Sequence, residues 1–254
     1  MEEYEHILRN MLKADKPWSK HEIRTALPTV IKKWGGVKFL VDPTYNRTEY
    51  ILWLRSKPPE HSGTSYLAET FAGQTITMVD AGANVGIFSL PIAKAASPDS
   101  RFLLIEPNPA ALGRLRANIA LNRLTNVEVV ETALGATDGE ARLYFSKNGN
   151  LGEARIGLPF DQDYGGIDVP IRALPGLLAA RGMDRVDLLK VDVEGLEDKV
   201  ILPLLTAEPK IDLQKVYFED AHAEDWDEDV GAALLAAGFE AGPRFGENAL
   251  YLRV

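Results

Sequence analysis

The chain has 254 residues, 46% of them hydrophobic and 26% charged, which is typical of an ordinary globular protein in water. Its formal net charge of -9 argues against a nucleic-acid substrate, because nucleic-acid binding draws much of its affinity from Lys and Arg on phosphates. The absence of cysteine excludes disulfides, a thiolate nucleophile and a cysteine-ligated zinc site, and it fits a cytoplasmic location.

Two observations speak against export and against membrane insertion. The first residues, MEEYEHILRN, lack the basic and then apolar layout of a secretory signal. The only long apolar window, residues 75–96, contains Asp80, Asn84 and Pro91, which are unsuited to a bilayer core. We therefore expect no membrane span.

Residues 1–70 differ from the rest of the chain in their pattern of apolar and polar residues. Apolar residues at helical spacing predict helices within Glu2–Lys13 and Lys20–Trp34. Two stretches rich in Pro, Ser, Thr and charge are predicted to be loops: 42–50 and 56–64. Because the segment is sparsely apolar, we expect a helical and loop cap over a main domain of residues 71–254.

From residue 75 the pattern alternates between strands and helices. The predicted strands have nearly continuous apolar runs, as in a parallel sheet buried on both faces: 75–81, 101–106, 127–133, 186–192 and 215–219. The predicted helices lie between them and after them: 85–96, 109–122, 195–206 and 225–237. Pro91 inside the first of these helices predicts a kink.

Two further pairs of strands are expected. Residues 139–146 and 167–173 look like extra strands around a loop rich in Gly and Asn. A final pair, 239–245 and 249–254, is separated by Gly-Glu-Asn and reads as a hairpin. The prediction is an α/β fold with a mostly parallel sheet and an antiparallel last strand, where an NAD-binding domain has a parallel one.

The most informative motif is the turn after the first predicted strand of the main domain. It reads D-x-G-x-N-x-G from Asp80 to Gly86, where Gly82 permits a sharp turn and Gly86 permits close packing of the helix that follows. Glu106 ends the next strand, 20 residues past Gly86, where a carboxylate can accept hydrogen bonds from both hydroxyls of a ribose.

The acidic residue at the start of this motif narrows the class of cofactor. A carboxylate at Asp80 repels a pyrophosphate, but it suits a cationic cofactor without phosphates. S-adenosylmethionine is such a cofactor, since it consists of a sulfonium, an amino acid and an adenosine.

Three blocks carry a family resemblance: VDAGANVGIFSL, LIEPNP and VDLLKVDVEGLE. Together they resemble the FkbM-type family of S-adenosylmethionine-dependent methyltransferases, over roughly Met78 to Asp220. The resemblance implies a class I methyltransferase fold, which is Rossmann-like. It also implies transfer of a methyl group, usually to a hydroxyl of a small molecule or sugar.

The residues expected to bind the cofactor follow from this motif and this resemblance: Asp80, Gly82, Asn84, Gly86, Glu106, Pro107, Asn108, Thr132, Ala133 and Asp192. Backbone N–H groups of the turn suit the methionine carboxylate, and Asp80 either offsets the ammonium or orients the turn. Glu106 is expected to hold the ribose, and Thr132 and Ala133 to contact adenine. Asn108 is equally suited to be only a helix cap.

The residues expected to carry catalysis are Asp192, Glu194 and His222. Alternation along the strand points Asp192 and Glu194 the same way, and one of them can take a proton from an acceptor hydroxyl. Lys190 also points that way, so a structural ion pair with Asp192 is the alternative. His222 has an ordinary pKa near neutrality and is a second candidate for the base.

Two other expectations concern a metal and the acceptor. Asp192, Glu194, Glu219 and His222 together offer ligands for Mg²⁺ or another divalent ion. The polar loop 146–155 is expected to contact the acceptor through Asn148, Asn150 and Arg155, with Glu219 nearby, unless it is a plain solvent loop.

Three other functions remain open alternatives. An NAD-dependent dehydrogenase would need a further glycine for the pyrophosphate, in the place of Ala81 or Asn84, and neither position holds one. An N-methyltransferase acting on a small-molecule amine would use the same fold. A non-catalytic module that only binds the cofactor is the third, and the pair Asp192 and Glu194 speaks weakly against it.

Overall fold

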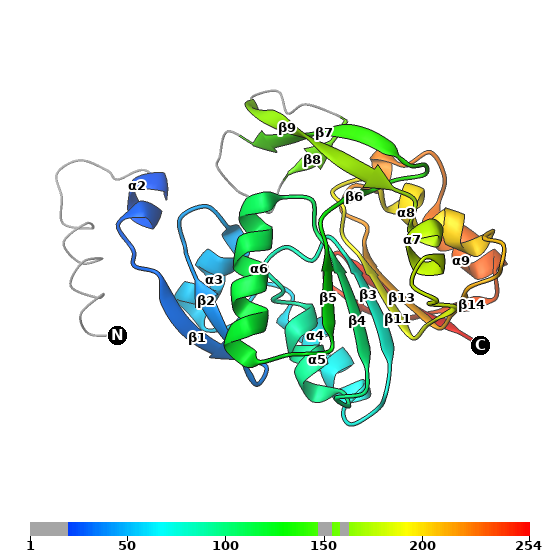
Figure 1. Ribbon diagram of the computed structural model, residues 1–254, viewed down its shortest axis with the longest axis horizontal. Helices are drawn as coiled ribbons and strands as arrows, with labels where there is room; N and C mark the ends of the chain where they lie inside the picture. Colours follow the sequence, from blue (N-terminus) through cyan, green and yellow to red (C-terminus); the bar gives the residue numbers. More distant parts are fainter. Residues whose placement is uncertain (1–19, 147–153, 158–162) are drawn as a thin grey trace.

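The computed structural model describes residues 20–146, 154–157 and 163–254 (Figure 1). Within these ranges a seven-stranded sheet has the order β14-β15-β13-β11-β3-β4-β5. The bounds of its strands are β3 Thr77–Ala81, β4 Arg101–Ile105, β5 Val127–Val130, β11 Leu188–Val191, β13 Lys215–Glu219, β14 Phe239–Phe245 and β15 Asn248–Arg253. Neighbours from β5 to β13 pair in parallel, whereas β15 is antiparallel to both β13 and β14. The predicted antiparallel last strand is thus confirmed.

Helices cover both faces of this sheet (Figure 1). On one face lie α4 (His61–Thr70), α5 (Ser89–Ala95) and α6 (Pro109–Asn122). On the other lie α7 (Leu174–Ala179), α8 (Glu197–Leu205) and α9 (Val230–Ala236). Successive strand residues alternate between the two apolar clusters, since Met78 belongs to one and Val79 to the other. Burial on both faces explains the continuous apolar runs in the sequence.

The amino-terminal segment is built differently from its prediction. It contains α2 (Lys20–Thr25), the antiparallel hairpin β1 (Val30–Trp34) and β2 (Val37–Val41), and the helices α3 (Arg47–Arg55) and α4. The helix expected over 20–34 therefore gives way to a strand in its second half, and the expected loops at 42–50 and 56–64 contain the starts of α3 and α4. The helix expected over 2–13 lies outside the described residues.

Alternation explains why this hairpin forms. Val37, Phe39 and Val41 are fully buried, whereas Lys38 between them is exposed. These side chains join the same apolar cluster as Met78 and the helices of that face. The segment consequently shares its core with the main domain.

Several boundaries in the main domain also differ from the prediction; the helix expected over 225–237, for example, begins only at Val230. The first helix begins at Ser89 rather than at residue 85, so Pro91 falls in its first turn, where a missing N–H is tolerated and no kink is required. The third predicted strand, 127–133, is divided: β5 ends at Val130, and β6 (Ala133–Leu134) belongs to another sheet. By contrast, α6 has its predicted bounds, because Asn108 caps it and Pro109 opens it.

A second, four-stranded sheet lies beyond the carboxyl edge of the main sheet (Figure 1). Its order is β6-β9-β7-β8, with β7 at Gly139–Ser146, β8 at Arg155–Ile156 and β9 at Asp163–Arg172. The two extra strands expected here are present as β7 and β9. A short parallel pair, β10 (Arg185–Val186) and β12 (Asp212–Leu213), and the turn η2 (Ala223–Asp225) complete the elements that position the site.

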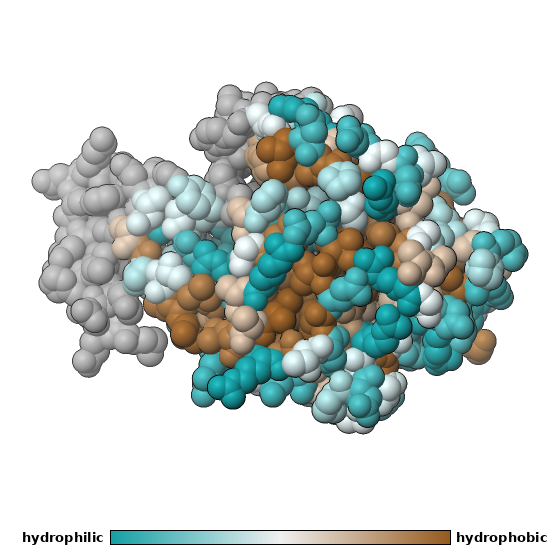
Figure 2. All heavy atoms as spheres, viewed as in Figure 1, coloured by the Kyte–Doolittle hydropathy of each residue, from teal (hydrophilic) through white to brown (hydrophobic). Residues whose placement is uncertain are grey.

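The surface is mixed in character. Figure 2 shows apolar side chains gathered around α6 and β5, the edge strand, whose residues Val127, Val129 and Val130 are half-buried. No helix within the described ranges is both long enough and apolar enough to cross a lipid bilayer.

Asn118 on α6 ties the amino-terminal hairpin to the turn after β3. Its side chain is fully buried, accepts a hydrogen bond from Leu40 N (2.8 Å) and donates one to Val85 O (2.9 Å). One turn later, Asn122 makes the corresponding contacts with Lys38 N (2.8 Å) and Lys38 O (2.6 Å), but at the exposed end of the hairpin.

These two asparagines offer a matched test of how firmly the hairpin is attached. Asn118→Ala strands two buried backbone groups and should lower the free energy of unfolding by about 2–4 kcal/mol. Asn122→Ala exposes its partners to water and should cost about 1 kcal/mol or less. Denaturant unfolding measures both, and equal losses would contradict the assigned role of Asn118.

Candidate functional site

The turn after β3 packs closely against the end of β11 and against helix α6. Gly82 has a φ of 82°, and a Cβ on it would lie 1.8 Å from Asp192 O, so no side chain fits where β11 ends beside it. Gly86 also has a φ of 82°, and a Cβ there would lie 2.7 Å from Leu115 Cδ1 on α6. Gly82 therefore serves the turn itself, whereas Gly86 serves the packing of α5 and α6.

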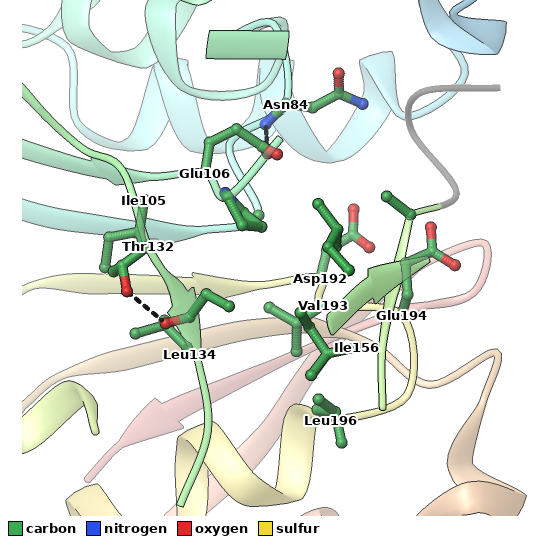
Figure 3. A pocket seen from close by; sticks show the side chains of 15 residues that line it. Asn84, Ile105, Glu106, Thr132, Leu134, Ile156, Asp192, Val193, Glu194 and Leu196 are labelled. Carbon is green, nitrogen blue, oxygen red and sulfur yellow. Dashed lines mark hydrogen bonds between the residues drawn. The ribbon is translucent and has the colours of Figure 1, made fainter. Parts of the chain in front are cut away.

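Glu106 is held at the end of β4 by the backbone around it. Its Oε2 accepts a hydrogen bond from Asn84 N (2.7 Å) and its Oε1 accepts one from Asn108 N (2.9 Å) (Figure 3). Burial raises the pKa of Glu106 to about 7, although these two hydrogen bonds oppose the increase. Each carboxylate oxygen keeps a free lone pair, so the group can accept further hydrogen bonds.

A cavity lies between Glu106 and the end of β11, which we call the Glu106 cavity (Figure 3). Seven of the residues expected to bind the cofactor line it: Gly82, Asn84, Glu106, Pro107, Thr132, Ala133 and Asp192. Three do not: Asp80, Gly86 and Asn108. Asn108 instead accepts a hydrogen bond from Ala110 N (3.0 Å), as the helix cap that the sequence left open.

The second sheet supplies an apolar wall of this cavity. Leu143 of β7, Ile156 of β8 and neighbouring Ala154 face it, opposite Ile105 and Leu134. Sequence reasoning did not identify these residues, because nothing in a two-residue strand such as β8 signals its place in a wall. The Thr132 hydroxyl donates to Pro170 O (2.8 Å), so Thr132 contributes surface rather than a free donor.

Lys190 is the buried cation of the site. Its Nζ lies 3.2 Å from Asp80 Oδ1 and 3.3 Å from Asp192 Oδ2, and it donates a hydrogen bond to Gly82 O (2.8 Å). Burial alone would lower the pKa of Lys190, but the nearby carboxylates outweigh burial and raise it. The ion pair that the sequence analysis weighed is therefore present, and Asp80, fully buried, is placed to orient the turn.

A second cavity continues from the first on the side of the amino-terminal segment. The two share Gly82, Asn84 and Asp192, and the second is also lined by Glu60, Thr64, Phe88 and Lys190. Sequence reasoning missed Glu60, which stands before α4 and far from the motifs in the chain. Burial and the charges of Asp192 and Asp80 raise the pKa of Glu60 to about 7 against the effect of Lys190.

Glu194 reaches the Glu106 cavity by a route other than the predicted one. The strand ends at Val191, and Glu194 has a left-handed φ of 57°, so alternation does not relate it to Asp192. Its Oε2 lies 3.6 Å from His222 Nε2 and 3.9 Å from Arg155 Nε. Arg155 Nη2 in turn lies 3.1 Å from His222 Nε2. Within the described residues, His222 lines neither cavity.

Glu219 ends β13 opposite Asn248 of β15. Burial raises the pKa of Glu219 to about 9, and the negative charges of Asp192, Glu194 and Glu60 add to this effect. Glu219 thus lies next to Asp192, which follows the neighbouring strand β11, and close to the residues expected to be catalytic.

The expected divalent metal site at Asp192, Glu194, Glu219 and His222 finds no support in the geometry. Among the residues that the structure describes, no three His, Asp or Glu side chains are arranged to hold a metal ion. The physical reason is that fixed cations already occupy these positions, since Lys190 pairs with Asp192, and Arg155 lies against Glu194 and His222. Asn148 and Asn150 lie outside the described residues.

Two curated fungal proteins are similar to this chain. Methyltransferase sdnD of Sordaria araneosa is 35% identical over 152 residues, which cover 49% of this chain and 58% of the relative. Methyltransferase 1 of Beauveria bassiana is 30% identical over 141 residues, which cover 49% of this chain and 56% of the relative. The matched regions thus span little more than half the length of these relatives.

Among solved structures, a methyltransferase from Geobacter sulfurreducens matches with a TM-score of 0.49 and 17% identity, over 82% of this chain and 86% of that one. The description "Methyltransferase FkbM domain" belongs to a family model that matches residues 80–241, from the turn after β3 to the start of the last hairpin. That match covers more than half of the sequence, and with it the chain belongs to the FkbM methyltransferase domain family.

Proposed function

We propose that this protein is an S-adenosylmethionine-dependent methyltransferase that methylates a hydroxyl group on a small molecule or sugar. The observation that carries the proposal is the Glu106 carboxylate, fixed by two backbone N–H groups and facing a cavity at the carboxyl edge of the sheet. Ligands of such sheets bind outside the carboxyl ends of the strands.

The residues present fit the adenosine part of this cofactor. Glu106 can accept hydrogen bonds from the ribose hydroxyls, because each of its oxygens has a lone pair left. Ile105, Leu134 and Ile156 offer apolar surface to a purine ring. The amino-acid end then runs past Gly82 and Asn84 towards the second cavity, which shares both residues.

The amino-terminal segment contributes to the site in this proposal. Glu60 and Thr48 line the second cavity, and Asn46 Nδ2 donates to Asn84 Oδ1 (2.7 Å) in the turn that borders both cavities. We assign residues 1–70 to a cap that helps to bind cofactor and acceptor, and residues 71–254 to the methyltransferase domain. The acidic, cysteine-free composition supports a cytoplasmic protein with a small-molecule partner.

S-adenosylmethionine, when bound, supplies a methyl group on a sulfonium sulfur, and the C–S bond breaks towards sulfur as the acceptor oxygen takes that methyl. An alcohol is a poor nucleophile, so a group of the protein must accept its proton. Asp192 is paired with Lys190, whose Nζ lies 3.3 Å from its Oδ2, so we leave the proton to another carboxylate. We assign the proton to Glu194, which lines the Glu106 cavity and can pass it to His222, 3.6 Å away.

One observation favours N-methylation as a second candidate. Carboxylates outnumber cations around Asp192, which suits an amine acceptor that is positively charged before it loses a proton. In that case the same carboxylates would hold the ammonium and take its proton. A panel of alcohols and amines, assayed for S-adenosylhomocysteine release, separates the two reactions.

The first prediction concerns the ribose contact. Glu106→Gln removes the charge but keeps the shape, and it should weaken S-adenosylhomocysteine binding by about tenfold or more, since hydrogen bonds to a charged group contribute about 1.5–3 kcal/mol each. Ionisation of a group with a pKa of about 7 should also make wild-type binding tighter as pH rises from 6 to 8. The variant should show a smaller pH dependence. Calorimetry measures both, and unchanged affinity in the variant would place the ribose elsewhere.

The second prediction concerns the proton acceptor. Glu194→Gln should lower turnover by about 10²–10⁴-fold with little loss of S-adenosylhomocysteine affinity. His222→Ala should lower turnover less, because His222 acts through Glu194, and Asp192→Asn should weaken cofactor binding as well as turnover, because Lys190 loses a partner. Glu224→Gln, an exposed carboxylate of η2, is the matched control.

Full turnover in Glu194→Gln and His222→Ala would refute this assignment of the base. A protein that binds S-adenosylmethionine but methylates no alcohol or amine of the panel would instead support the non-catalytic binding module. Metal dependence is tested in the same assay, because turnover that is lost with chelator and restored by Mg²⁺ would contradict proton removal by Glu194 and His222 alone.

A further inference from the structure

Two carboxylates line the second cavity, and a third lies next to one of them at the end of the neighbouring strand. Glu60 lines it from the start of α4, Asp192 lines it from the end of β11, and Glu219 stands beside Asp192 at the end of β13. Glu219 shares a face of β13 with Tyr217, which pairs in register with Lys190. We call Glu60, Asp192, Glu219, Lys190 and Tyr217 the carboxylate chamber.

The chamber has more carboxyl groups than cations. Lys190 Nζ donates a hydrogen bond to Gly82 O and lies 3.2 Å from Asp80 Oδ1 and 3.3 Å from Asp192 Oδ2, so this cation is already engaged. Among the described residues, neither Glu60 nor Glu219 has an ion-pair partner, and the pKa of each is raised by burial and by the neighbouring carboxylates. Carboxylates in such a setting favour the entry of a cation.

A second, independent observation points to a ligand here. Tyr217 is fully buried, and in the part of the chain that the structure describes its hydroxyl has no hydrogen-bond partner. The hydroxyl lies beneath α4, since a Cβ on Gly63 would be 2.3 Å from it, and it interacts electrostatically with Glu60, Lys190 and Asp192. A buried donor without a partner is destabilising, and a polar ligand group can offset that cost.

We propose that the carboxylate chamber recognises the positive charge on the sulfur of the bound cofactor, so that Glu60 and Glu219 make the site prefer S-adenosylmethionine to S-adenosylhomocysteine. The inference rests on the proposed function. With adenosine held at Glu106, the chain beyond the ribose enters the chamber along the wall that the two cavities share, at Gly82, Asn84 and Asp192.

This arrangement has a consequence for turnover. Methyl transfer removes the charge from sulfur and leaves the amino acid and the adenosine as they were. The chamber therefore loses the part of its attraction that came from the sulfur when the product forms, which favours exchange of S-adenosylhomocysteine for the next S-adenosylmethionine. Glu60 and Glu219 act as residues that determine charge specificity, separate from the proposed base Glu194.

The test compares three ligands without any acceptor. S-adenosylmethionine has a charged sulfur, S-adenosylhomocysteine a neutral one, and sinefungin replaces the methylated sulfur by a carbon bearing an amine that is positively charged near neutral pH. Calorimetry at pH 7.5 should show that the wild-type protein binds both charged ligands about tenfold or more tightly than S-adenosylhomocysteine. The ratio isolates the charge at this one position, because all three ligands share the adenosine and the amino acid.

Charge-neutral variants then assign the preference to the chamber. Glu60→Gln should reduce the preference by about threefold or more, Glu219→Gln should reduce it in the same direction, and the double variant should nearly abolish it. Glu69→Gln, an exposed carboxylate on the same helix α4, is the matched control and should keep the wild-type ratio. Circular dichroism and binding of S-adenosylhomocysteine show that each variant is folded.

The outcomes separate this inference from the function on which it rests. A wild-type protein that binds all three ligands but prefers S-adenosylhomocysteine, or a preference that Glu60→Gln and the double variant leave unchanged, would overturn the inference and leave the proposed function intact. Failure of the wild-type protein to bind any of the three would overturn the proposed function itself.

Discussion

The arrangement of the site depends on one buried ammonium, that of Lys190. It lies between two neighbouring parallel strands, β3 and β11, where it forms ion pairs with Asp80 and Asp192 and donates a hydrogen bond to the Gly82 carbonyl. Asp80 is wholly buried, and a buried carboxylate without a partner costs several kcal/mol. Lys190 thus allows an acidic residue to begin the turn at Asp80, and it fixes the end of β11 where the two cavities meet. The shapes of the Glu106 cavity and of the carboxylate chamber both depend on this cation.

The amino-terminal segment is packed into the main domain and forms part of the site. Phe39 and its neighbours in β2 bury themselves against the same apolar cluster as Met78 and Leu104, and Asn118 links that strand to the turn after β3. Through Asn46, the segment also contacts the Asn84 side chain. The helix α4 then places Glu60 above the carboxyl edge of the sheet. A segment packed in this way can shape an acceptor site without forming a separate domain.

The sequence predicted the parts of the structure that local rules determine. Continuous apolar runs located β3, β4, β11 and β13, and the cap Asn108 with Pro109 located α6 to the residue. It did not predict the β1–β2 hairpin, since β1 alternates only between half-buried and exposed residues, and β2 packs against α6, which is distant in the chain. Glu60 was missed for a related reason, because its charged neighbours Asp192 and Lys190 come from a strand far along the sequence. The Glu194 position was found, but by an argument that its left-handed backbone does not satisfy.

Charge divides the carboxyl edge of the sheet into two regions with different chemical capacities. At Glu194 the negative charge is compensated within the protein, since Arg155 and His222 lie within 3.9 Å and 3.6 Å of its carboxylate. Such a group is ready to exchange a proton, because a neighbouring imidazole can receive it. At Glu60 and Glu219 the described residues supply no ion-pair partner and burial raises the pKa of both groups, so a cationic ligand would favour their ionised form. Asp192 lies between the two regions and belongs to both cavities. Under the proposed function both kinds of environment lie at this edge of the sheet, since Glu194 follows β11, Glu219 ends the neighbouring strand β13 and Glu60 precedes α4.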